Sequence, residues 1–97
     1  MKRLEGKIAI VTGASRGIGE AIATAFAREG AHVVIASRKK QALDEVAARI
    51  NAEYPDAVST QACHMGDSQQ VETLIDCVTT TYGVPNVIVN NAGTNPY

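Results

Sequence analysis

The sequence predicts an α/β fold built on a doubly wound parallel sheet with helices on both faces. Three features of the 97-residue chain predict it: short apolar runs recur along the chain, amphipathic stretches of helical length separate them, and a glycine-rich turn follows the first run. Strands that alternate with helices are joined by right-handed crossovers, which make the strands parallel. Four strands and three helices are expected.

The first strand and the first helix lie between residues 8 and 30. The run Ile8-Ala9-Ile10-Val11 is apolar and partly β-branched, which is typical of a strand buried on both faces. A helix is predicted from Gly17 to Glu29, and Gly30 can end it in the left-handed conformation. The apolar residues that recur at three- and four-residue steps on this helix are Ile18, Ile22, Ala25 and Phe26.

The second strand and the second helix repeat this pattern. Residues 33–36 form another buried-strand run, preceded by His32, for which the sequence offers no evident partner. The helix that follows ends near Tyr54, because Pro55 disfavours helical backbone before it. Its apolar stripe consists of Leu43, Val46, Ala47 and Ile50.

The third strand, residues 57–62, has a weaker pattern than the others. Asp67, with Gln70 three residues later, resembles a capping box that opens a third helix. Gly83 and Pro85 end that helix. Its stripe consists of Val71, Leu74, Ile75, Val78 and Tyr82.

A fourth buried strand, Val87-Ile88-Val89, leads into the polar turn Asn90-Asn91-Ala92-Gly93. We therefore expect residues 1–97 to form the N-terminal part of a single Rossmann-type domain, truncated after the fourth strand, with strand order 3-2-1-4. Ligands of such sheets bind beyond the carboxyl ends of the strands where the order reverses, here between strands one and four. The open apolar edge predicts marginal stability for the piece alone.

Composition excludes several classes of protein. A content of 45% hydrophobic and 20% charged residues fits one small globular domain, and a net charge of −1 gives no concentrated basic face for nucleic acid or a membrane surface. No apolar stretch approaches the roughly 18 to 20 residues of a spanning helix, and no signal peptide precedes the first strand, so we expect a cytoplasmic protein. Cys63 and Cys77 lack metal-ligand spacing and are expected to be ordinary buried or half-buried thiols, with no metal site.

The turn after the first strand carries Gly13, Gly17 and Gly19 in a Gly-xxx-Gly-x-Gly pattern. Glycine lets a backbone turn tightly and approach a pyrophosphate, while the amides that open the next helix point at the anion. Plain chain reversal is the alternative, but the position between a buried strand and an amphipathic helix favours nucleotide binding. A P-loop requires lysine and then serine or threonine after its last glycine, whereas Gly19 is followed by Glu20 and Ala21.

The glycine turn and the Asn90-Asn91-Ala92-Gly93 turn together resemble those of the short-chain dehydrogenase/reductase family, and the resemblance covers essentially all 97 residues. It implies a cofactor whose diphosphate and adenosine ribose lie against the glycine turn, and a second turn that lies against the cofactor and braces the sheet. A left-handed turn after a strand is the alternative role for the asparagines. The implied residues are Gly13, Ser15, Arg16, Gly17, Ile18 and Gly19 in the first turn, and Asn90, Asn91, Ala92 and Gly93 in the second.

The residues after the second strand favour NADP over NAD. Proteins that prefer NAD place a carboxylate there for the ribose 2′-hydroxyl, and this carboxylate would repel a 2′-phosphate. The chain has Ser37-Arg38-Lys39-Lys40 instead, and Arg38 can pair bidentately with phosphate and stack on adenine. Arg16, inside the glycine turn, can approach the same phosphate.

One position departs from the family pattern. Many members carry an aspartate after the third strand that meets the adenine amino group, whereas this chain has Cys63-His64-Met65-Gly66 there. We assign His64 and Met65 to the cofactor site, with a surface or packing histidine as the alternative. The same stretch and the C-terminal residues are similar to a branch of NADPH-dependent carbonyl reductases in the family, the dehydrogenase/reductase member 4 type.

Catalysis in the family uses a serine and a Tyr-xxx-Lys pair, in which the tyrosine donates a proton to the carbonyl oxygen as hydride arrives from the nicotinamide. No Tyr-xxx-Lys occurs here, because Val58 follows Tyr54 and Asn86 follows Tyr82 at that spacing, and Tyr97 is the last residue. No catalytic residue is therefore assigned, and the 97-residue chain alone is predicted to be inactive. We expect the full-length form to be a homo-oligomer that acts on a small carbonyl or alcohol substrate. A non-catalytic nucleotide-binding module, or a regulatory piece that pairs through its open edge, remains the alternative.

Overall fold

The computed structural model describes residues 3–14, 17–64 and 66–91. Seven elements alternate along them: β1 (Ile8–Thr12), α1 (Gly17–Arg28), β2 (His32–Ser37), α2 (Lys40–Glu53), β3 (Val58–Ala62), α3 (Ser68–Thr81) and β4 (Val87–Asn90). Every predicted element is present, in the predicted order. The strands and α1 begin and end within one residue of the predicted bounds.

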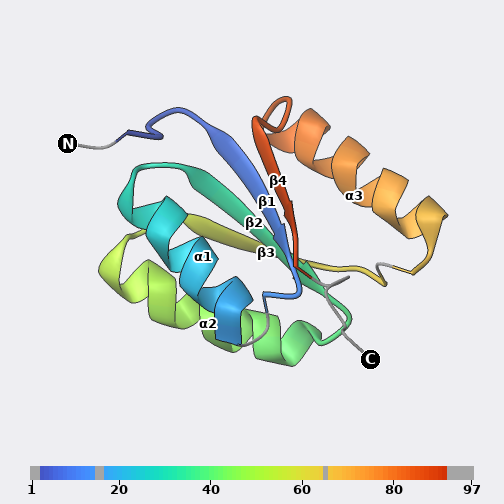
Figure 1. Cartoon of the computed structure of the whole chain (residues 1–97), viewed down its shortest axis with the longest axis horizontal. Helices are drawn as coiled ribbons and strands as arrows, with labels where there is room; N and C mark the ends of the chain where they lie inside the picture. The colour runs from blue at the N-terminus through green and yellow to red at the C-terminus, as the bar shows by residue number, and fades with distance from the viewer. Residues whose placement is uncertain (1–2, 15–16, 65, 92–97) are drawn as a thin grey trace.

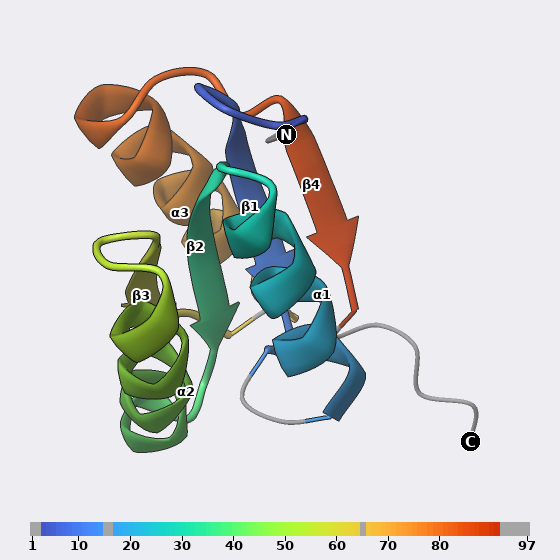
Figure 2. The ribbon, with the colours of Figure 1, turned by 90° about the vertical axis from the view of Figure 1, so that its left-hand side faces the viewer.

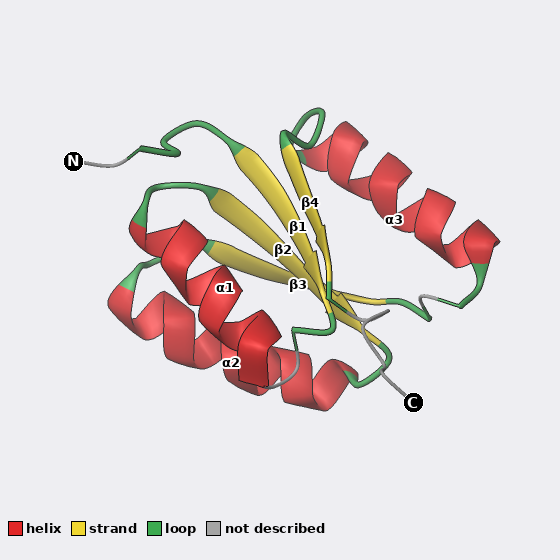
Figure 3. Ribbon diagram, in the orientation of Figure 1, coloured by secondary structure: helices red, strands yellow, loops and turns green. Residues whose placement is uncertain are grey.

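The four strands form one parallel sheet in the order β3-β2-β1-β4, so the predicted strand order is confirmed. β1 and β2 are the inner strands, with Ile10 paired to Val34 on one side and to Ile88 on the other. Helices α1 and α2 cover one face of the sheet and α3 covers the other (Figures 1 and 2). Colouring by secondary structure shows the same layers, with the strands between the helices (Figure 3).

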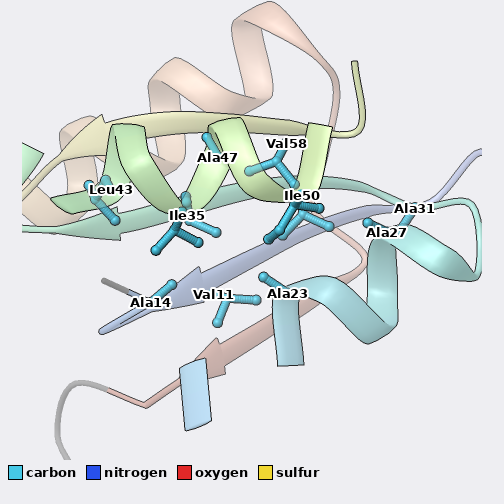
Figure 4. Close-up of a cluster of buried hydrophobic side chains, with 12 residues drawn as sticks. Val11, Ala14, Ala23, Ala27, Ala31, Ile35, Leu43, Ala47, Ile50 and Val58 are labelled. Carbon is cyan, nitrogen blue, oxygen red and sulfur yellow. The ribbon is translucent and has the colours of Figure 1, made fainter. Parts of the chain in front are cut away.

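The core consists of two buried clusters, one on each face of the sheet. Side chains alternate between the faces along a strand, so Val33 and Ile35 pack under α1 and α2 while Val34 packs under α3. Figure 4 shows the cluster between the sheet and helices α1 and α2, where Leu43 and Ile50 of α2 lie over the sheet. All four predicted core positions of α2 are buried, which confirms its predicted stripe.

The predicted stripe of α1 was wrong in detail. Its buried residues are Gly19, Ala23 and Ala27, four residues apart, whereas Ile18 is 70% exposed. The larger residues Ile22 and Phe26 pack only at the margin of the core. The reason is that α1 lies so close to the sheet that only small side chains fit directly beneath it, a constraint that hydrophobicity alone does not reveal.

The start of α3 confirms only half of the predicted capping box. Asp67 is the N-cap residue, and its side chain accepts hydrogen bonds from the backbone amides of Gln69 and Gln70. The Gln70 side chain does not return to Asp67. Its Oε1 instead accepts from the backbone N–H of His64 at 2.8 Å, so it holds the loop before the helix.

Three further expectations were wrong. Two of them concern the burial of side chains, which the tertiary structure sets, and the third concerns the partners of His32. Cys77 lies on the outer side of α3 and is exposed, while Cys63 is buried as expected. The fourth strand is only half-buried, because β4 is an edge strand and Ile88 is 53% exposed. His32 does have partners: its ring stacks on Tyr82 at 4.2 Å between centroids, and its Nε2 lies 3.0 Å from Ser59 Oγ. Burial lowers the pKa of His32.

Candidate functional site

The turn from β1 to α1 reverses the chain at the carboxyl edge of the sheet. Gly13 and Gly17 both have positive φ values, 66° and 60°, a conformation that side-chain-bearing residues rarely adopt. The amide of Gly13 donates to the carbonyl oxygen of Ala36 at 2.8 Å, which ties the turn to the end of β2. Ser15 and Arg16, also predicted here, lie outside the described residues.

Gly19 brings helix α1 against this turn. A Cβ atom at Gly19 would lie 2.5 Å from the carbonyl oxygen of Gly13 and 2.7 Å from Cα of Ala14, closer than real Cβ contacts. The absence of a side chain therefore lets the first turn of α1 pack directly on the end of β1. Ile18, the residue before it, is exposed at the start of the helix.

The first turn of α1 carries an acidic residue whose charge is paired. Glu20 accepts two hydrogen bonds from the guanidinium of Arg49, at 2.9 and 3.0 Å. This pairing with Glu20 raises the pKa of Arg49. Because backbone N–H groups at a helix start carry partial positive charge, neutralising a nearby carboxylate leaves that end more favourable for an anion.

The turn after β4 is bonded to the glycine turn. Asn91 donates from its backbone amide to Thr12 Oγ1 at 3.0 Å and from its side-chain Nδ2 to the carbonyl oxygen of Gly13 at 3.3 Å. The Thr12 hydroxyl also lies 3.2 Å from Oδ1 of Asn90. The two turns, far apart in sequence, are therefore one hydrogen-bonded unit. Ala92 and Gly93 lie outside the described residues.

Thr12 joins the two turns, although no role was predicted for it. It is 1% exposed, and its hydroxyl also lies 3.3 Å from the carbonyl oxygen of Val89. A hydroxyl at the buried end of an otherwise apolar strand was the available signal, because a buried polar group requires a partner.

Replacing Thr12 with valine keeps the shape of the side chain and removes the hydroxyl. We expect Thr12→Val to lower the free energy of unfolding by about 2 kcal/mol, because the Asn91 amide loses its acceptor in a part-buried position. Urea unfolding would measure the loss. Thr12→Ser is the matched control, since it keeps the hydroxyl and loses a methyl group worth about 0.8 kcal/mol. Equal losses in the two variants would show that the hydroxyl does not hold the turns together.

The residues after β2 differ in whether their side chains have partners in the described part of the chain. Ser37 Oγ accepts from the amide of Lys39 at 3.0 Å, which fixes the loop. Lys40 is paired with Asp44 at 2.7 Å, and hydrogen bonds from Lys40 and then Thr60 hold the pKa of Asp44 below its usual value. Arg38 is exposed, and within the described residues its guanidinium has no hydrogen-bonding or ionic partner.

The loop after β3 lies beside the loop after β2. The amide of Cys63 donates to the carbonyl oxygen of Ser37 at 2.8 Å. His64 follows with an exposed side chain, and its Nδ1 accepts from the amide of Gly66 at 3.0 Å. Burial, and then the charge of Asp67, raises the pKa of the Cys63 thiol, which is consistent with an unreactive core cysteine. Met65 lies outside the described residues.

The structure thus brings the described site residues to one edge of the sheet, the carboxyl ends of all four strands, where β1 and β4 flank the reversal of strand order. Their roles toward a cofactor stay predictions. Within the same ranges no three His, Cys, Asp or Glu side chains gather as metal ligands would. Nor is any described helix long and apolar enough to cross a membrane.

A parallel sheet of this order, with a glycine turn at the reversal point, defines a Rossmann-type α/β protein. The family profile for short chain dehydrogenase matches residues 7–97. The chain therefore belongs to the short-chain dehydrogenase family and corresponds to its N-terminal region.

Curated relatives agree with this assignment. The chain is 43% identical over 95 residues to tropinone reductase-like 3 of Erythroxylum coca, covering 98% of this chain and 36% of that protein. It is 42% identical over 94 residues to dehydrogenase/reductase SDR family member 4 of Oryctolagus cuniculus, covering 97% of this chain and 36% of that protein. The chain thus spans 36% of the length of both relatives.

Solved structures share the fold. L-sorbose reductase from Gluconobacter frateurii, in complex with NADPH and L-sorbose, superposes with a TM-score of 0.88 at 37% identity, covering 97% of this chain and 36% of that one. A metagenomic short-chain oxidoreductase in complex with NADP gives a TM-score of 0.88 at 38% identity, covering 94% of this chain and 41% of that one.

Proposed function

We propose that this chain binds NADP(H) as the nucleotide-binding part of an oxidoreductase that transfers hydride between NADPH and a carbonyl or alcohol substrate. The observation that carries the proposal is the hydrogen-bonded unit of the two turns at the reversal of strand order, beside a loop whose exposed Arg38 has no hydrogen-bonding or ionic partner among the described residues. Solved relatives whose structures contain NADPH or NADP support it.

The glycine turn fits a diphosphate. Gly13 and Gly17 have positive φ values that glycine adopts readily, and because glycine has no Cβ, no side chain separates their backbone from an approaching anion. The first amides of α1 add hydrogen-bond donors and the positive end of the helix dipole. We assign Gly13, Ser15, Arg16, Gly17, Ile18 and Gly19 to this part of the cofactor.

The loop after β2 fits a 2′-phosphate. Of its basic residues, Lys40 is already paired with Asp44, whereas the guanidinium of Arg38 is available in the described part of the chain. A planar guanidinium matches the geometry of a phosphate, and residues 37–40 contain no carboxylate to repel it. NADP(H) is therefore the form that this loop favours.

The second turn fits a bracing role. Asn91 uses its side chain to hold Gly13, so neither it nor Asn90 is assigned as a catalyst. The bound nicotinamide supplies the hydride. In the whole protein, the proton would come from a tyrosine with a neighbouring lysine, as the family resemblance implies, and the substrate would be a small carbonyl compound or alcohol.

A calorimetric titration of the full chain tests the proposal. We expect NADPH to bind at least about tenfold more tightly than NADH, because the charge-assisted bonds to one extra phosphate are worth more than about 1.5 kcal/mol. Circular dichroism in the same buffer establishes that the protein is folded. A folded chain that binds neither nucleotide contradicts the proposed function, and equal affinities contradict the preference for NADP(H).

A further inference from the structure

We propose that His64 recognises the adenine base of the cofactor as a hydrogen-bond donor, so that this site accepts a hypoxanthine base nearly as well as adenine. The inference rests on the proposed NADP(H) function. It concerns the position at which many family members carry an aspartate. An ionised aspartate can accept hydrogen bonds but cannot donate them.

The backbone of His64 is held from both sides. Its N–H donates to Oε1 of Gln70 at 2.8 Å, and its carbonyl oxygen accepts from the amide of Asp67 at 3.0 Å. Both partners belong to the start of α3, which Asp67 caps. His64 therefore has a fixed position relative to α3, even though its side chain is exposed.

The ring of His64 is held in one tautomer. Its Nδ1 accepts the backbone N–H of Gly66 at 3.0 Å, which requires a lone pair on that nitrogen. In a neutral imidazole the single proton then resides on Nε2, which can only donate. Glycine is needed for this contact, because a Cβ at Gly66 would lie 2.8 Å from Cε1 of the ring.

The ring also lies beside the loop assigned to the 2′-phosphate. The bond from the Cys63 amide to the Ser37 carbonyl joins the two loops immediately before His64 and Arg38. If Arg38 holds the ribose phosphate, the attached base would lie beside the same pair of loops, where the exposed ring of His64 offers a donor at Nε2.

Adenine and hypoxanthine present opposite patterns of hydrogen-bond donors and acceptors at positions 6 and 1 of the purine ring. Adenine has a 6-amino donor beside the N1 acceptor, whereas hypoxanthine has a 6-carbonyl acceptor beside an N1–H donor. A side chain that only donates finds an acceptor on either base, at adjacent atoms. A carboxylate that faces the 6-amino group of adenine would instead face the carbonyl oxygen of hypoxanthine and be repelled.

The experiment compares the affinities of NADP⁺ and nicotinamide hypoxanthine dinucleotide phosphate for the full chain by calorimetry. We expect the wild type to bind the two within about threefold of each other, and His64→Asp to favour the adenine cofactor by about tenfold or more. Using the ratio of the two affinities cancels the added negative charge, which affects both nucleotides equally. His64→Ala, which lacks donor and acceptor, should keep the ratio near the wild-type value.

An unchanged ratio in His64→Asp, or strong discrimination by the wild type, would overturn the inference while NADP⁺ still binds. Absence of NADP⁺ binding by the folded wild type would instead contradict the proposed function. Nitrogen NMR of the histidine ring gives an independent measurement on the free protein. A proton on Nε2 supports the inference, and a proton on Nδ1 contradicts it.

Discussion

Arg38→Asp should shift the ratio of NADPH to NADH affinity by about 100-fold towards NADH, because the variant removes charge-assisted bonds of about 1.5–3 kcal/mol and places a like charge near the 2′-phosphate. The guanidinium of Arg38 is exposed and without a partner among the described residues, so its loss breaks no contact within them. The introduced carboxylate can accept hydrogen bonds from the ribose hydroxyls of NADH. Calorimetric titration with both nucleotides measures the ratio.

Lys39→Asp is the matched control, because it makes the same change of charge at the adjacent exposed position. Its ratio should move by less than about threefold, since only screened long-range electrostatics changes. Arg38→Lys keeps the charge and loses the planar fork, and should fall between wild type and Arg38→Asp. If Lys39→Asp shifted the ratio as far as Arg38→Asp, net charge and not a specific arginine would determine the preference.

Gly19→Ala should lower the free energy of unfolding by about 3 kcal/mol, the upper end of the usual cost of overpacking. The added Cβ would meet three backbone atoms, the carbonyl oxygen and carbon of Gly13 and Cα of Ala14, all within 2.9 Å. Backbone cannot rotate away as a flexible side chain can, so α1 must move off the end of β1. Because this movement displaces the helix amides assigned to the diphosphate, NADPH affinity should also fall by about tenfold or more.

Gly6→Ala separates this clash from backbone strain. Gly6 has a positive φ of 81°, and a Cβ there would meet nothing within 4 Å, so the control carries a conformational cost of about 1–2 kcal/mol and no steric contact. Gly6 lies before β1, outside the candidate site, and its replacement should leave NADPH affinity unchanged. Urea unfolding and calorimetry measure both effects. A Gly19→Ala variant as stable as Gly6→Ala would show that α1 does not need this close approach.

Periodicity and turn chemistry in the sequence were sufficient for the order of elements and the topology. The strands and the buried stripe of α2 follow from apolar patterns, which are local properties. The strand order β3-β2-β1-β4 was predicted from the Rossmann arrangement that alternating strands and helices favour. The two turns could also be located, because glycine and asparagine mark positions where the backbone needs unusual conformations. The resemblance to the short-chain dehydrogenase/reductase family rests on the same residues.

Which side chains contact each other could be seen only in the folded chain. The buried face of α1 runs through Gly19, Ala23 and Ala27, because the spacing between helix and sheet excludes the larger residues that hydrophobicity favours. Thr12 joins two turns that are far apart in sequence, as its hydrogen bond with Asn91, 79 residues away, shows. The partners of His32, which are Ser59 and Tyr82, likewise come from other segments of the chain. Patterns along the chain were therefore enough to predict the order of the elements and the positions of the turns. The contacts could not be predicted in this way, because hydrogen bonds and close packing depend on distances between segments that the chain brings together only on folding.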